Sequence, residues 1–271
     1  MNKTVKVIVL RTAGTNCDQE TAFAFSHFGA QVDLVHINAL LRKEIKLEDY
    51  HILAVPGGFT YGDDIESGRI LANELRFHLS TDLEQFVYDK KLIIGICNGF
   101  QVLVKTGILP GKTSEDEKEI STFPPQTVSL IGNDSGKFED RWTYLKVDGH
   151  SVWTRDLPSI AYFPVAHAEG KFVLADKKQL QVLGDNGQVA FRYCTVNGRN
   201  PFYPQNPNGS FDHIAGITDP SGRVLGLMPH PERHFLFRHH PSWTRLKKQS
   251  SYGDGAKIFA NGVWYVENHL L

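Results

Sequence analysis

The sequence has few cysteines, no long apolar run and almost no net charge, and each shortage excludes a class of protein. Three cysteines, Cys17, Cys97 and Cys194, are too few and too scattered for a disulfide framework, and an odd number leaves a free thiol. The longest clean apolar run near the start, residues 7–10, is far shorter than the roughly 20 apolar residues of a membrane span. We therefore expect a cytoplasmic protein whose cysteines are available for chemistry.

The charge balance and the length narrow the class further. Lys and Arg (29) nearly cancel Asp and Glu (30), so the bulk charge favours neither nucleic acid nor an anionic membrane as a partner. Hydrophobic residues make up 41% of the 271 residues, which is enough for a sizeable core. The length lies near the upper limit for one globular domain, and we expect a single domain over residues 1–271.

The first hundred residues alternate short β-rich apolar runs with helix-like stretches, which indicates β-α-β units. Strands are predicted at residues 5–10, 32–37, 52–55 and 92–97, and helices at residues 18–28 and 82–88. The pattern predicts the α/β class, with an open, mostly parallel sheet flanked by helices. The loop Pro-Gly-Gly-Phe at residues 56–59 follows a predicted strand, at the edge where such sheets bind ligands.

Residues 112–203 have a different texture, rich in turns and in alternating segments that favour antiparallel strands. Such strands are predicted at residues 142–147, 171–175 and 189–193, and three prolines make residues 200–209 a loop. We interpret this part as an antiparallel β elaboration within the same domain. A last strand at residues 224–228 and a helix at about residues 256–268 complete the prediction.

The strongest chemical signal is Gly-x-Cys-x-Gly around Cys97, between a predicted buried strand and a helix-compatible stretch. Glycines two before and two after a nucleophile allow the tight strand-to-helix turn called a nucleophile elbow. A thiol at a helix N-terminus is favoured as thiolate. A small buried hydrophobe at a strand end is the alternative interpretation of this cysteine.

Two other cysteines compete with Cys97 for this role. Cys17 follows the first predicted strand, but no glycine follows it and the neighbouring Asp18 would disfavour a thiolate. Cys194 lies in a predicted antiparallel strand and is interpreted as structural.

A cysteine nucleophile needs a histidine to move protons and a carboxylate to fix the histidine tautomer. Pro-His-Pro-Glu at residues 229–232 offers His230 and Glu232. The prolines are expected to hold this tetrapeptide extended, which would place both side chains on one face. Alternatively, the prolines merely end the preceding strand.

The remaining motifs give no metal or nucleotide site. His234, His239 and His240 lack a partner at metal-ligand spacing and are predicted to belong to a solvated basic segment. His167 and Glu169 are candidates to line a pocket, but no Cys-x-x-Cys follows them, so a zinc-deaminase site is excluded. The segment at residues 107–113 resembles a phosphate loop but has the wrong glycine spacing.

Taken together, these motifs resemble class I glutamine amidotransferases, and among them the separate glutaminase subunits of phosphoribosylformylglycinamidine (FGAM) synthases. The resemblance spans nearly the whole chain and implies a flavodoxin-like fold. It depends on the segments at residues 14–18 (GTNCD), 56–63 (PGGFTYGD), 95–101 (GICNGFQ), 141–142 (RW), 166–170 (AHAEG) and 228–233 (MPHPER).

The resemblance implies a role for each matching residue. Cys97 would be the nucleophile, His230 the general base and acid, and Glu232 the residue that orients the histidine. The backbone N–H groups of Gly58 and Asn98 would form the oxyanion hole, and Gln101 and Phe59 would bind glutamine. No cofactor is expected in this chain.

The same resemblance implies an ATP-dependent partner. The large synthetase subunit would hold ATP and Mg²⁺ and receive ammonia, and a small accessory subunit is a further candidate partner. The chain departs from the common form in the acidic run at residues 64–67 and in an extra loop at residues 234–252. A free-standing cysteine hydrolase of the same fold and an inactive amidotransferase-like regulatory module are the alternatives.

Overall fold

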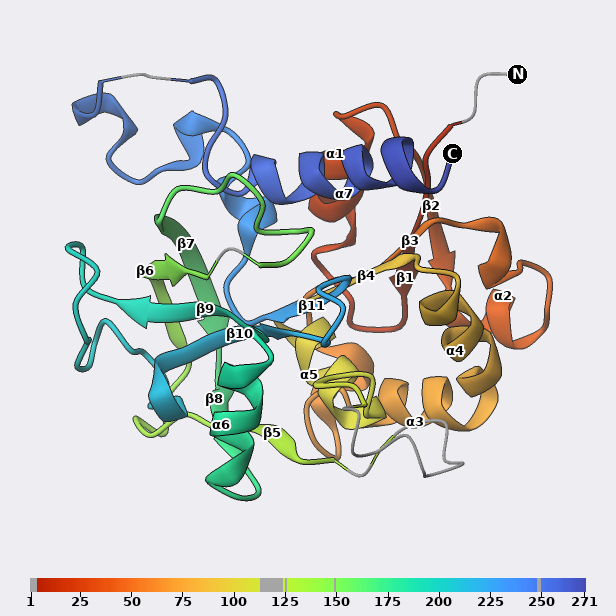
Figure 1. Cartoon of the computed structure of the whole chain (residues 1–271), viewed down its shortest axis with the longest axis horizontal. Helices are drawn as coiled ribbons and strands as arrows, with labels where there is room; N and C mark the ends of the chain where they lie inside the picture. The colour runs from red at the N-terminus through yellow and green to blue at the C-terminus, as the bar shows by residue number, and fades with distance from the viewer. Residues whose placement is uncertain (1–3, 113–123, 125, 149, 248–249) are drawn as a thin grey trace.

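The computed structural model describes residues 4–112, 124, 126–148, 150–247 and 250–271. Its centre is a nine-stranded sheet of order β2-β1-β3-β4-β11-β10-β9-β6-β7 (Figure 1). The strands are β1 Lys6–Arg11, β2 Gln31–His36, β3 Ile52–Val55, β4 Leu92–Ile96, β5 Val128–Gly132, β6 Glu139–Val147, β7 Ile160–His167, β8 Glu169–Leu174, β9 Val189–Cys194, β10 Ile214–Thr218 and β11 Val224–Leu227. The helices are α1 Asp18–Ser26, α2 Ile37–Leu41, α3 Arg69–His78, α4 Ser80–Tyr88, α5 Asn98–Thr106, α6 Lys178–Asp185 and α7 Ala256–His269.

The sheet changes character at β11. Strands β2, β1, β3, β4 and β11 pair in parallel, whereas β10, β9, β6 and β7 continue the same sheet by antiparallel pairing. A separate antiparallel pair, β5 and β8, lies beside this second half. The predicted parallel sheet with an antiparallel elaboration is therefore confirmed. The single domain over residues 1–271 stays a prediction, supported by the continuity of the sheet.

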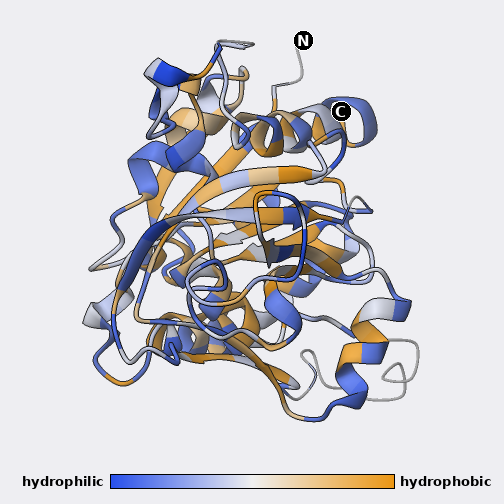
Figure 2. Ribbon diagram, turned by 90° about the vertical axis from the view of Figure 1, so that its left-hand side faces the viewer, coloured by the Kyte–Doolittle hydropathy of each residue, from blue (hydrophilic) through white to orange (hydrophobic). Residues whose placement is uncertain are grey.

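Helices cover both faces of the parallel half, with α1 and α7 on one side and α3, α4 and α5 on the other (Figure 1). Strands β3, β4 and β11 are buried at every residue, as expected for parallel strands covered on both faces. Figure 2 shows the same layering in chemical terms, because the apolar colour concentrates on the inner strands and the polar colour on the outer parts of the helices.

Most predicted elements lie within one or two residues of the observed ones, but some were missed. Helices α2, α3 and α6 and strands β5, β7 and β10 were not predicted. Strand β7 contains Pro164, which argues against a strand in the sequence, yet β7 is the outermost strand of the sheet, where a proline is tolerated. Residues 113–123, 125 and 149 of the predicted elaboration, and 248–249 of the extra loop, lie outside the described residues.

The carboxyl ends of the parallel strands meet at one edge of the sheet, and the loops that leave them carry the candidate site. Cys17 lies after β1, Gly58 after β3, Cys97 after β4 and His230 after β11. This is the edge at which open α/β sheets bind ligands.

Close backbone packing at this edge gives a testable prediction. A Cβ added at Gly99 in α5 would lie 1.8 Å from the carbonyl oxygen of Val55, whereas one added at Gly184 in α6 would meet nothing within 4 Å. Gly99→Ala should lower the free energy of unfolding by about 3 kcal/mol. Gly184→Ala, the matched control, should be neutral or stabilising by up to about 1 kcal/mol. Urea unfolding measures both, and equal effects would contradict the packing described.

Candidate active site

Cys97 lies on the sharp turn that the sequence predicts. Strand β4 ends at Ile96, α5 begins at Asn98, and Cys97 between them has φ 52° and ψ −107°. A positive φ is unusual for a residue with a side chain and is a strain that concentrates at functional sites. Cys97 is 5% exposed, and its Sγ contacts the Ala166 carbonyl oxygen at 3.7 Å. The elbow geometry is confirmed.

His230 and Glu232 form a buried pair just after β11. The His230 Nδ1–H donates to Glu232 Oε1 at 2.6 Å, and each residue is only 2% exposed. Burial disfavours the imidazolium, but the Glu232 carboxylate, helped by the sulfurs of Cys97 and Cys17, outweighs this and holds the pKa of His230 well above its ordinary value. Glu232 therefore fixes which ring nitrogen carries a proton, and leaves Nε2 free for another group.

The predicted extended conformation of residues 229–232 is wrong beyond His230. His230 itself is extended (φ −105°, ψ 90°), but Pro231–His234 form a 3₁₀ turn. The proline at the start of the turn has the φ that a helix requires, so it initiates the turn. Glu232 still reaches His230, because the side chain folds back over this turn.

Three loops converge on the bare Cα of Gly57. A Cβ there would lie 2.8 Å from His230 Cε1, 3.3 Å from Cys97 Cβ and 3.3 Å from Cys17 Sγ. The structure thus brings the predicted nucleophile and the predicted base to the same point from positions 133 residues apart in the chain. His230 Nε2 and Glu232 Oε2 are buried and have no hydrogen-bond partner among the described residues.

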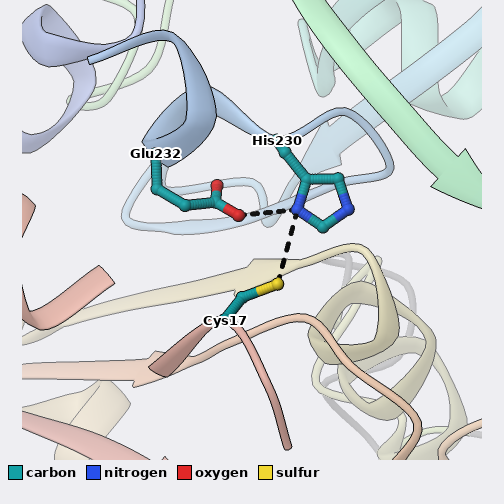
Figure 3. A group of neighbouring side chains, drawn as sticks. All are labelled: Cys17, His230 and Glu232. Atoms are coloured by element: carbon teal, nitrogen blue, oxygen red, sulfur yellow. Dashed lines mark hydrogen bonds and ion pairs between the residues drawn. The ribbon is translucent and has the colours of Figure 1, made fainter. Parts of the chain in front are cut away.

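Cys17 is closer to this pair than the sequence suggested. Its Sγ lies 3.9 Å from His230 Nδ1, on the side of the ring that also faces Glu232 (Figure 3). The thiol donates to Asn16 Oδ1 at 3.2 Å, and Arg233 Nη2 donates to the sulfur at 3.1 Å. The neighbouring Asp18, expected to act on the thiol, instead pairs with Arg11 Nε at 2.6 Å.

The predicted oxyanion-hole residues lie on two backbone segments beside the cysteine. Gly58 has φ +145°, and a Cβ there would come within 2.7 Å of Asn16 N and Gly14 O, so only glycine fits. Asn98 is the first residue of α5, so its backbone N–H has no partner within the helix. The assignment of these two N–H groups as the oxyanion hole stays a prediction.

The side chain of Asn98 joins the elbow to the predicted glutamine-binding residue. Its Oδ1 accepts from Thr60 Oγ1 at 2.7 Å, and its amide donates to Gln101 Oε1 at 3.1 Å. Gln101 Nε2 donates onward to the Glu169 carbonyl oxygen at 2.5 Å. Gln101 is 4% exposed, so it lies at the buried end of the site, while Phe59 is 45% exposed and stacks on Phe138. Their binding roles stay predictions.

His167 belongs to the hydrogen-bond network behind the site. Its Nδ1–H donates to Asn133 Oδ1 at 3.2 Å, and Asn208 Nδ2 donates to its Nε2 at 3.4 Å. Burial, reinforced by the nearby His230, lowers the pKa of His167 to about 4. A histidine that is neutral at neutral pH, with both nitrogens hydrogen-bonded, braces the β7–β8 corner. Nothing in the sequence pattern distinguished it from a pocket residue.

The prediction of a solvated segment is wrong for His234. This side chain is 4% exposed, and its Nδ1–H donates to the Tyr162 carbonyl oxygen at 2.7 Å. His240 is half-buried against Trp142 and Tyr162, while His239 is exposed. The extra loop thus folds back onto β6 and β7 because its aromatic side chains find aromatic partners there.

The described residues include no helix long and apolar enough to cross a membrane.

The elbow, the buried His–Glu pair and the mostly parallel sheet match the arrangement expected of a cysteine-dependent glutamine amidotransferase. A family model for the CobB/CobQ-like glutamine amidotransferase domain matches residues 4–266, and the chain belongs to this family. The resemblance inferred from the motifs is confirmed.

The most specific similarity is to one branch of the family. The chain is 46% identical over 263 residues to the phosphoribosylformylglycinamidine synthase subunit PurQ of Dehalococcoides mccartyi, with 96% of each chain covered. It is 41% identical over 274 residues to PurQ of Archaeoglobus fulgidus, with 97% of each covered. Among solved structures, PurLQS from Thermotoga maritima has a TM-score of 0.70 at 28% identity, covering 97% of this chain and 100% of that one. Another glutamine amidotransferase from Thermotoga maritima, at 14% identity and a TM-score of 0.53 over 97% of this chain and 98% of that one, shares the fold alone.

The low pKa of His167 predicts a pH dependence of stability. The unfolded chain protonates this side chain below about pH 6.5 while the folded chain keeps it neutral down to about pH 4. The free energy of unfolding should therefore fall as the pH drops through this window, by about 3 kcal/mol from this residue. Urea unfolding of His167→Gln between pH 7 and 4.5 should show a shallower fall than the unsubstituted chain. Parallel curves would exclude this role.

Proposed function

We propose that this chain is the glutamine amidotransferase subunit of an FGAM synthase, acting in de novo purine biosynthesis. It hydrolyses glutamine to glutamate and ammonia and passes the ammonia to a synthetase subunit that converts formylglycinamide ribonucleotide to FGAM. The observation that carries the proposal is the convergence on Gly57 of a cysteine at an elbow and a buried, carboxylate-bound histidine. The chain is 46% and 41% identical to two PurQ subunits over nearly its whole length, and this similarity supports the proposed substrate and partner.

In this mechanism the Cys97 thiolate attacks the side-chain amide carbon of glutamine. His230 Nε2 accepts the proton of the Cys97 thiol, and the N-terminus of α5 stabilises the thiolate that results. The N–H groups of Gly58 and Asn98 stabilise the tetrahedral oxyanion. His230 then protonates the departing ammonia, and water hydrolyses the γ-glutamyl thioester with the same nitrogen acting as base.

Glu232 acts through the tautomer of His230. Because Nδ1 donates to Glu232 at 2.6 Å, Nε2 is the nitrogen available to exchange a proton with Cys97. Cys17 faces the opposite nitrogen, Nδ1, which Glu232 already occupies. The geometry therefore supports Cys97 rather than Cys17 as the nucleophile.

The partner supplies the second half of the reaction. ATP and Mg²⁺ bind the synthetase subunit in this proposal, and a small accessory subunit completes the assembly. The solved PurLQS complex supports an assembly of this kind. A free-standing hydrolase would need no such partner, and an inactive module would release no glutamate, so glutamate release with and without the synthetase separates the three functions.

Cys97→Ala should abolish glutamine-dependent FGAM synthesis by the assembled complex and leave ammonia-dependent synthesis largely intact. The expected loss of glutaminase rate is about 10⁴-fold or more, as for nucleophile removal in other triads. Cys17→Ser is the matched control, because it removes a buried thiol at the same site and should change the rate by less than about threefold. The reverse pattern would make Cys17 the nucleophile.

The purified chain alone should hydrolyse glutamine slowly, and titration with the synthetase plus nucleotide and acceptor should raise the rate. The Gly58 N–H lies on a loop that continues into residues 60–67, our candidate partner contact, in which Asp64 and Ile65 are exposed. Docking there would fix the oxyanion donor. Ile65→Asp should weaken the stimulation, whereas Tyr88→Asp, a change at another exposed hydrophobic residue, on α4, should not. Full turnover without a partner would favour the free-standing hydrolase.

A further inference from the structure

Three metal-binding side chains meet on the Nδ1 side of the His230 ring. Cys17 Sγ, His230 Nδ1 and a Glu232 carboxylate oxygen all lie within 4.8 Å of one another (Figure 3). We propose that these three groups form a binding site for Zn²⁺, and that bound zinc inactivates the triad. The inhibition, though not the binding, rests on the proposed glutaminase activity.

The donor set is one that zinc prefers. Thiolate, imidazole and carboxylate bind Zn²⁺ at about 2.3, 2.0–2.1 and 2.0–2.2 Å, so tetrahedral ligands lie about 3.3–3.8 Å apart. The 3.9 Å between Cys17 Sγ and His230 Nδ1 is close to this separation. The 2.6 Å between His230 Nδ1 and Glu232 Oε1 must widen by about 0.7 Å, as expected when a metal replaces a shared proton.

The surroundings pack closely against the ligands and hold them in place. A Cβ at Gly57 would lie 2.8 Å from His230 Cε1 and 3.3 Å from Cys17 Sγ, so glycine is the residue that fits beside both ligands. Glu232 Oε2 is buried without a hydrogen-bond partner among the described residues, which leaves a second carboxylate oxygen for the metal. A water molecule would complete the tetrahedron.

One contact opposes binding and must change. Arg233 Nη2 donates to Cys17 Sγ at 3.1 Å, and a guanidinium next to a metal ion is repelled by it. Arg233 is half-buried, so its guanidinium has solvent to turn toward. Cys17, His230 and Glu232 are each at most 2% exposed, so binding also needs a local opening and should be slow.

Zinc at this position would disable the base. On binding, the Cys17 thiol and His230 Nδ1 both release their protons to solvent, the thiolate and Nδ1 coordinate the metal, and Nε2 takes up or keeps one proton. A neutral imidazole that binds a metal through Nδ1 carries its own proton on Nε2. Nε2 is the nitrogen that must accept the proton of Cys97, so the nucleophile would remain a thiol.

The activity test uses the chain with its synthetase subunit, preincubated with Zn²⁺ at buffered free concentrations. The unsubstituted protein should lose glutaminase activity slowly at low Zn²⁺. With each rate taken relative to the same variant without metal, Cys17→Ser should need at least about tenfold more Zn²⁺ for half inhibition than the unsubstituted protein. Cys194→Ser, another buried free cysteine, should behave like the unsubstituted protein. Equal inhibition of the Cys17 and Cys194 variants, or no inhibition at all, would overturn the proposal.

A spectroscopic test is independent of any activity. Co²⁺ replaces Zn²⁺ and gives a near-ultraviolet charge-transfer band when a thiolate binds it. Cys97→Ala should show this band, because Cys17 remains, and the double variant Cys97→Ala/Cys17→Ser should not. A band that needs Cys97, or that survives the loss of Cys17, would refute the site even if the chain hydrolyses glutamine as proposed.

Discussion

The surrounding structure has to keep His230 and Glu232 buried and oriented toward each other, because their hydrogen bond compensates for the burial of a carboxylate. Removing a carboxylate from water costs several kcal/mol unless charge and hydrogen bonds compensate, and here the 2.6 Å contact with the imidazole provides that compensation. The orientation of the pair comes from β7, because the His230 N–H donates to the Pro164 carbonyl at 2.8 Å and His234 donates to that of Tyr162 at 2.7 Å. The outer strand of the antiparallel half, β7, therefore positions the proposed acid–base residue His230, which follows a strand of the parallel half.

The local parts of the fold and site could be predicted from the sequence because each depends on neighbouring residues. Strands β3 and β4 and the elbow at Cys97 follow from short apolar runs and two glycines. The pairing of His230 with Glu232 was also predicted, although by the wrong conformation, because side chains two apart can meet in a 3₁₀ turn as well as on an extended chain. In each case the pattern and the contact lie within a few residues of each other.

The parts that could not be predicted depend on contacts between distant segments. Cys17 reaches His230 across 213 residues and receives a hydrogen bond from Arg233, and no spacing rule connects them. From the sequence, the Asp18 carboxylate was expected to act on the adjacent Cys17 thiol, whereas in the fold it pairs with Arg11. His167 became a structural residue only because Asn133 and Asn208 surround it, and burial in that network decides its protonation.

The order of the site residues along the chain has a consequence for biosynthesis of the protein. The ribosome makes Cys17, Gly57 and Cys97 long before His230 and Glu232. The turn that holds Glu232 also needs Gly255, which comes later still, because a Cβ at Gly255 would lie 1.9 Å from the Pro231 carbonyl oxygen. A nascent or prematurely terminated chain therefore has a thiol but no base. With the roles proposed above, a chain that stops before His230 would release no ammonia from glutamine.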